Sequence, residues 1–204
     1  TAGKLGEQTL RLLDNYNYTV YVPTDESIQK LIDDGLLPTW DDYEAQTEEV
    51  WGSEEKADSA QAIIKNIIVN FLRYHIQDHS VAVNMAPDQY DEQKNGETVV
   101  KVPKYENKFE TMLRNPETGQ YYSITVNNEK GQMWVKDGLG KTHNVVLSAN
   151  GFHNRLCREY WFSGTENYMT TYMASDAVVH QIDGVLLPKN MTRWEDELNK
   201  LKNQ

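Results

Sequence analysis

Apolar residues recur at helical spacing through the first half of the chain. From Asp58 onward they follow one another at one- and four-residue offsets, which gives a broad apolar face and predicts a central core helix. The residues on this face are Ile63, Ile64, Ile67, Ile68, Phe71, Leu72 and His75. Because His75 shares this face, we expect a core histidine that hydrogen-bonds to the backbone.

An alternating pattern of β-branched and aromatic residues predicts a strand from Tyr18 to Val22. Pro23 should end this strand, because proline has no N–H to donate to a neighbouring strand. Thr24 then stands at the N-cap of a helix whose first turn carries Asp25-Glu26, where the helix dipole favours anions. A short amphipathic helix is also expected at residues 5–13, before the strand.

The region from Val99 to Leu147 predicts several strands in succession. Asn115–Gly119 has the composition of a hairpin turn and leads into an alternating run at 121–126. Successive strands favour an antiparallel meander and the α+β class over βαβ units. Thr192 to Glu195 fits a capping box that opens a C-terminal helix.

The charge balance limits the classes of partner. The 204-residue chain has 20 basic and 31 acidic residues, and its net charge of -11 would repel nucleic acid and an anionic membrane surface. We therefore expect neither as a partner. Acid is densest from Asp33 to Ser59, which we interpret as a solvated loop with short helical pieces. The alternative is a cation or ligand site, but the spacing of an EF-hand is not present.

The start of the chain bears on localisation. The sequence opens Thr1-Ala-Gly-Lys-Leu5 without an initiator methionine, which indicates a cut from a longer precursor. No apolar run approaches the roughly 20 residues that span a bilayer, so we expect no membrane insertion by this segment.

Catalysis has no positive support in the sequence. Cys157 is the single cysteine, which excludes an internal disulfide and a CxxC site. His153 and Cys157 would share a face if their segment were helical, and a thiol hydrolase built on this pair is the remote alternative. His180 and Asp183 stand three apart in a strand-like run, which favours a structural hydrogen bond over a catalytic pair. No phosphate-binding glycine loop or zinc motif is present, so we expect a non-enzyme without cofactor or metal.

The aromatic residues of the acidic and late segments allow two interpretations. Trp40, Trp51 and Trp161 could anchor their segments onto the core, or they could form an exposed platform for a sugar ring or a protein. A large exposed apolar patch would favour a protein partner. A shallow groove with coplanar Trp or Tyr would favour a glycan.

Two segments near opposite ends of the chain resemble the two signature boxes of the fasciclin family. The residues that match the first box are Thr19, Val20, Pro23, Thr24 and Asp25, and those that match the last box are Val178, His180, Ile182, Asp183, Val185, Leu186, Leu187 and Pro188. Tyr74-His75 stands where the family carries its Tyr-His pair. Asp176-Ala177 departs from the family's Asn-Gly, so we expect the entry to this strand to be built differently.

The resemblance implies a fasciclin-like α+β fold, a wedge of antiparallel strands with packed helices, as one domain over 1–204. This chain is longer than a typical member, and we predict insertions at 37–59, 84–97 and 150–172. In animal members the Tyr-His region is associated with integrin adhesion, which would carry to Tyr74 and His75. The accompanying Asp-Ile element has no clear counterpart here.

The implied function is a non-catalytic adhesion or binding module for an extracellular protein or polysaccharide. We expect it to be exported and tethered at a cell surface through a preceding segment, in the style of a bacterial surface lipoprotein. The alternative is a structural spacer that holds a neighbouring domain away from the membrane.

Overall fold

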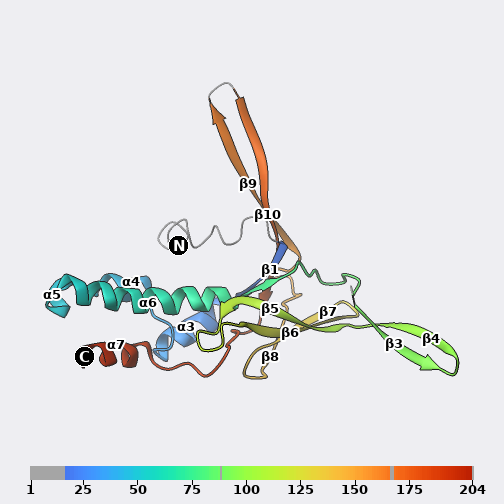
Figure 1. Cartoon of the computed structure of the whole chain (residues 1–204), viewed down its shortest axis with the longest axis horizontal. Coiled ribbons are helices and arrows are strands. Elements are labelled where there is room, and N and C mark those ends of the chain that lie inside the picture. The colour runs from blue at the N-terminus through green and yellow to red at the C-terminus, as the bar shows by residue number, and fades with distance from the viewer. Residues whose placement is uncertain (1–16, 88, 166–167, 204) are drawn as a thin grey trace.

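The computed structural model describes residues 17–87, 89–165 and 168–203, and for 157–176 it describes the backbone alone. An eight-stranded sheet runs in the order β8-β7-β6-β5-β2-β1-β10-β9 (Figure 1). Its strands are β1 (Asn17–Pro23), β2 (Ile76–Asp78), β5 (Glu106–Arg114), β6 (Tyr121–Glu129), β7 (Gln132–Lys136), β8 (Thr142–Asn144), β9 (Arg155–Thr165) and β10 (Tyr168–Ile182). The predicted amphipathic helix at 5–13 lies outside the described residues.

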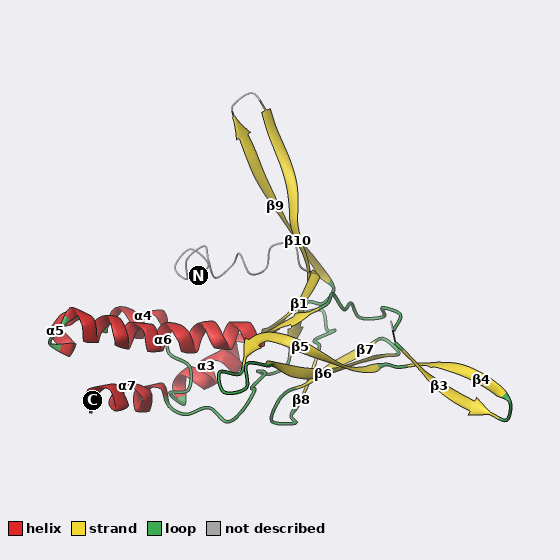
Figure 2. Ribbon diagram, viewed as in Figure 1, coloured by secondary structure: helices red, strands yellow, loops and turns green. Residues whose placement is uncertain are grey.

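Helices and strands occupy different halves of the molecule (Figure 2). The helices are α3 (Asp25–Asp33), α4 (Trp40–Glu44), α5 (Glu48–Trp51), α6 (Glu54–Tyr74) and α7 (Trp194–Lys202). The α+β class is therefore confirmed.

The strands of the two boxes lie side by side in the sheet, next to its β9 edge. β1 pairs in parallel with β10, from Asn17 opposite Asp176 to Pro23 opposite Ile182. The expectation of a wholly antiparallel sheet is wrong for this pair, because the long chain between the boxes supplies the crossover that parallel strands need. Asp176-Ala177 forms no entry turn, since β10 runs through it.

The β-rich region folds as predicted into consecutive hairpins. β5 pairs with β6, β6 with β7, and β7 with β8, all antiparallel. The turn between β6 and β7 has two residues, Lys130 and Gly131, at φ 53° and 78°. Positive φ at both positions matches the twist of the flanking strands, which fixes the register here.

The acidic stretch is more ordered than a solvated loop. Thr39 caps α4 through a capping box with Asp42, and α6 begins at Glu54, before the predicted Asp58, because Ser53 caps it. Trp51 packs on α6 in a cluster with Ala57, Ala60, Ile64 and Leu198. The helical pieces are confirmed, and they are held to the core helix by apolar contacts.

The two helix N-caps predicted from sequence have different outcomes. Thr24 caps α3 and accepts a hydrogen bond from the Ser27 N–H at 3.4 Å. The prediction of a capping box at Thr192 is wrong, because α7 begins at Trp194 and its N-cap is Arg193, which makes no side-chain cap bond. The Trp194 N–H instead donates to Gly35 O at 3.1 Å, and the Thr192 hydroxyl faces Glu197.

Two β-ribbons project from the body (Figure 1). One is formed by β3 (Tyr90–Asn95) and β4 (Thr98–Pro103), which pair only with each other in a separate two-stranded sheet. The other is the outer part of β9 and β10, beyond the point where β10 leaves β1. We call these the β3/β4 arm and the β9/β10 arm. They occupy much of the predicted insertions 84–97 and 150–172, where loops had been expected.

Charge is concentrated at the end of the helical half. Residues 40–58 contain eight acidic side chains and one basic side chain, a net charge of -7 out of the chain's -11. These residues form α4, α5 and the first turns of α6, at the end of the molecule opposite the β3/β4 arm (Figure 1).

Candidate binding cleft and arm surface

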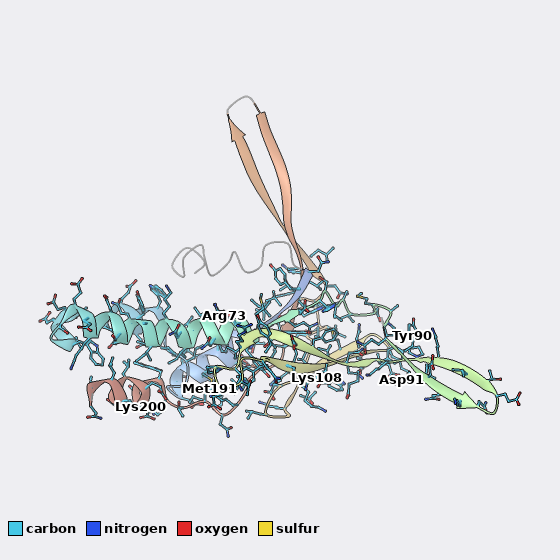
Figure 3. The ribbon with its side chains drawn as sticks, viewed as in Figure 1. Arg73, Tyr90, Asp91, Lys108, Met191 and Lys200 are labelled. Atoms are coloured by element: carbon cyan, nitrogen blue, oxygen red, sulfur yellow. The ribbon has the colours of Figure 1, made fainter. Side chains whose placement is uncertain are left out.

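An apolar cleft of about 430 Å³ lies where the helical half meets the sheet. α6, the β5–β6 hairpin and the segment 186–192 enclose it, and Met191 lies at the junction of the two halves (Figure 3). The apolar side chains that line it include Ile67, Phe71, Tyr74, Leu113, Tyr122 and Met191. We call this space the junction cleft.

The junction cleft has a rigid floor because Tyr74 and His75 anchor the segments beneath it. The Tyr74 hydroxyl accepts a hydrogen bond from the Gly138 N–H at 2.8 Å, and burial raises the pKa of Tyr74 to about 12. His75 Nδ1 lies 2.8 Å from Phe71 O, and Nε2 accepts from the Leu186 N–H at 3.1 Å. Because the Leu186 N–H can only donate, Nε2 of His75 must accept and carries no proton. His75 is therefore neutral, with its proton on Nδ1.

Burial holds His75 in this neutral form by lowering its pKa to about 4. The prediction of a core histidine bonded to the backbone is thus confirmed. Tyr74 and His75 are 1% and 3% exposed, so neither offers the contact surface that adhesion to an integrin through these two residues would need.

A second buried group, Asp137, ties the last box to the β7–β8 turn. One carboxylate oxygen accepts from the N–H groups of Leu139 and Lys141, at 3.0 and 2.9 Å. The other accepts from the Leu187 N–H at 3.2 Å and lies 3.3 Å from His143 Nε2. Both oxygens of this buried carboxylate therefore have hydrogen-bond partners, which is what makes its burial tolerable.

His180 and Asp183 act separately, as expected from their spacing. His180 Nε2 lies 2.8 Å from Val81 O, its Nδ1 accepts from the Asn154 N–H at 3.2 Å, and burial lowers its pKa. Asp183 accepts from the backbone N–H and the side-chain amide of Asn144, at 2.8 and 2.9 Å. Both are structural bonds that pin loops to the end of β10.

The β3/β4 arm exposes apolar side chains on both of its faces. Tyr90 is 51% exposed, Val99 50% and Val100 47%. Lys94 pairs with Val99, which puts Val99 on the face of Tyr90, and Val100 lies on the other face. Tyr90 lies at the start of the arm, clear of the body (Figure 3).

Exposed apolar side chains continue to the base of the arm. Met85 is 40% exposed and Tyr105 36%, and both line a second cleft of about 290 Å³ beside Phe109 and Asn107. The Asn107 side-chain oxygen is buried without a hydrogen-bond donor among the described residues. We call Tyr90, Val99, Val100, Tyr105 and Met85 the arm surface; in the sequence, only the Asn95-Gly96 pair before Val99 and Val100 signals it, as a hairpin turn.

Of the two interpretations of the aromatic residues, anchoring is the one that the described side chains of Trp40 and Trp51 fit. Trp51 is 8% exposed, and its indole N–H donates to the Gln46 side-chain oxygen at 2.9 Å, so it is an anchor. Trp40 is half-buried and stacks on Tyr43 with ring centroids 4.5 Å apart. The side chain of Trp161 lies outside the description.

The premise of the thiol hydrolase is wrong, because the segment is not helical. His153 stands in the loop before β9, and Cys157 is in β9 itself, paired with Ala177 of β10. Extended backbone rises about 3.3 Å per residue, so four residues separate the two positions by more than a helical turn would. Among the described residues, no three His, Cys, Asp or Glu side chains gather in a metal-binding arrangement.

No protein-family model matches this chain, and no curated protein matches its sequence. In the part of the chain that the structure describes, no helix is both long and apolar enough to cross a membrane.

Proposed function

We propose that this chain is a fasciclin-like, non-catalytic binding module that recognises a protein through the arm surface. The observation that carries the proposal is the β3/β4 arm itself: a ribbon with exposed apolar side chains on both faces and no covering layer among the described residues. An isolated two-stranded ribbon is at best marginally stable in water, so a partner that covers it would stabilise it. Its unpaired edges also offer backbone groups to a partner strand.

The resemblance to fasciclin domains is supported by the way the two boxes share one anchor. The Tyr21 N–H of the first box donates to His75 O at 2.9 Å, and the Leu186 N–H of the last box donates to the His75 ring. His75 therefore joins segments that are more than a hundred residues apart. A joint role of this kind would explain why the residues of all three motifs occur together.

A protein partner is favoured over a polysaccharide. Glycan recognition usually needs a flat Trp or Tyr exposed in a shallow groove, and none of the described tryptophans is exposed. Tyr90 is exposed, but it shares a face of the projecting ribbon with Val99. The arm surface instead combines two tyrosines with Val99, Val100 and Met85, on the projecting ribbon and at its base. Export and a cell-surface tether remain part of the proposal, and a preceding segment would have to supply them.

The test is a binding screen of the immobilised chain against extracellular proteins and polysaccharides, at low and high salt. We expect saturable binding of a protein that survives high salt, because apolar contacts are not screened. The triple variant Tyr90→Ser, Val99→Ser, Val100→Ser should abolish it. Val50→Ser is the matched control, since Val50 is 59% exposed on α5 at the other end of the molecule.

Two outcomes would contradict the proposal. Binding of a polysaccharide that the triple variant leaves unchanged would assign recognition to another surface and another class of ligand. No binding to any member of the panel by the folded chain would favour the spacer function.

A further inference from the structure

The junction cleft combines an apolar interior with positive charge at its mouth. Arg114 and Lys189 belong to its lining and are both exposed. The Arg114 guanidinium lies 5.1 Å from the centre of the Tyr121 ring, which holds it at the edge of the cleft. Within the described parts of the chain, neither cation has a carboxylate at ion-pair distance.

The acidic side chain in the lining, Glu197, is already occupied. Lys200 Nζ donates to its carboxylate at 2.7 Å, and the Thr192 hydroxyl donates to the same oxygen at 3.4 Å. The bond to Lys200 is the largest cause that lowers the pKa of Glu197, and the charge of Lys189 lowers it further. The mouth thus keeps a surplus of positive charge on a chain whose net charge is -11.

The walls are apolar and partly open to solvent. Ile67, Phe71, Tyr122 and Met191 are all half-buried around the cleft, so water contacts apolar surface that a ligand could cover. The volume of about 430 Å³ falls within the range of about 300–1,000 Å³ that is typical of small-molecule sites. The buried bonds of Tyr74 and His75 hold the floor in place, so the cleft is formed before a ligand arrives.

We propose that the junction cleft binds a single-chain amphiphile with an anionic head group, such as a medium-chain carboxylate. The alkyl chain would lie between α6 and Met191, and the carboxylate would meet Arg114 and Lys189 at the mouth. A planar guanidinium pairs with a carboxylate through two parallel hydrogen bonds, which sets the orientation of the ligand. A fully apolar ligand would gain nothing from either cation. This site is separate from the arm surface and does not depend on the function proposed for that surface.

The test is isothermal titration of the full chain with decanoate below its micelle concentration, with the uncharged decanol as a second ligand. We expect one decanoate per chain and an affinity for decanol at least about tenfold weaker. The double variant Arg114→Gln, Lys189→Gln should lower decanoate affinity at least about tenfold and leave decanol affinity unchanged. Met191→Trp should lower the affinity for both ligands, because the indole fills the cleft.

The matched control is Lys94→Gln, Lys101→Gln, which removes the same charge from the exposed β3/β4 arm and should leave both affinities unchanged. Melting temperatures of all variants confirm that they fold. The proposal is overturned if the folded chain gives no titration with decanoate, or if decanol binds as tightly as decanoate. It is also overturned if the Arg114→Gln, Lys189→Gln chain binds decanoate as well as the control does.

Discussion

The segment that closes the junction cleft and the β3/β4 arm are built on opposite principles. Leu186 and Leu187 after β10 have no regular strand partner, but buried side chains accept their N–H groups: His75 for one and Asp137 for the other. The arm has regular strand pairing throughout, and each of the ten residues from Tyr90 to Val99 is exposed. Irregular backbone is therefore fixed by buried hydrogen bonds in the first region, while regularly paired backbone in the arm is exposed to solvent.

The largest expected effect is on the side of the buried network. Asp137→Ala would remove the acceptor of four donors around a buried carboxylate, and we expect it to lower the free energy of unfolding by about 3–5 kcal/mol. Urea denaturation measures this change. Asp91→Ala, on the exposed arm, is the control and should change the value by less than about 0.5 kcal/mol. A similar loss in both variants would remove the contrast between the two regions.

The next effect is a dependence of stability on pH. His75 has a folded-state pKa of about 4 against an ordinary value of 6.5, so the unfolded chain binds the proton more readily. Stability from this group is fully present above pH 6.5 and is lost as the pH falls toward 4, by about 3 kcal/mol in all. We expect the free energy of unfolding to decline over this window. His75→Gln should make the decline smaller, and the part that remains is expected from His180, whose pKa burial also lowers. His79→Gln should retain the full decline, because the His79 side chain is exposed.

A smaller effect is expected when one bond of the network is removed. Tyr74→Phe deletes the hydroxyl that accepts from the Gly138 N–H and should cost about 1–2 kcal/mol. Tyr121→Phe is the control, because its ring is exposed and we expect less than about 0.5 kcal/mol. An equal cost at both positions would mean that the bond to Gly138 contributes nothing to the rigidity of the cleft floor.

The smallest effect should come from the arm. Replacing residues 90–103 by a short Gly-Ser linker should leave the cooperative unfolding of the body unchanged within about 1 kcal/mol, because the arm pairs only with itself. Amide hydrogen exchange on the intact chain gives the complementary result: we expect fast exchange for the β3 and β4 amides and slow exchange for β6. Slow exchange in the arm would show that the arm is stable without a partner.

Sequence patterns predict the structure correctly where periodicity and local chemistry decide it. The apolar spacing of Ile63 to Phe71 predicted α6, and Pro23 and Thr24 marked the change from β1 to α3. His75 was placed in the core because it shares the apolar face, and its backbone bond followed from that placement.

Sequence patterns do not predict the structure where partners distant along the chain decide it. Nothing local to β1 or β10 indicates a parallel pairing, since their contact spans the whole chain. Asp137 was not recognised, because Asp-Gly reads as a turn and its four donors come from segments up to fifty residues away. Trp51 appeared in an acidic stretch, and only its contact with α6 shows that it is buried.

The concentration of acid in residues 40–58 gives the molecule a negative end. In an electric field, or near a positively charged matrix, the protein has a preferred orientation, with α4 and α5 leading. An anion-exchange resin would hold it by that end and leave the β3/β4 arm facing the solvent. Capture by charge is thus a way to present the arm to candidate partners without a chemical linker, at salt low enough to keep the contact.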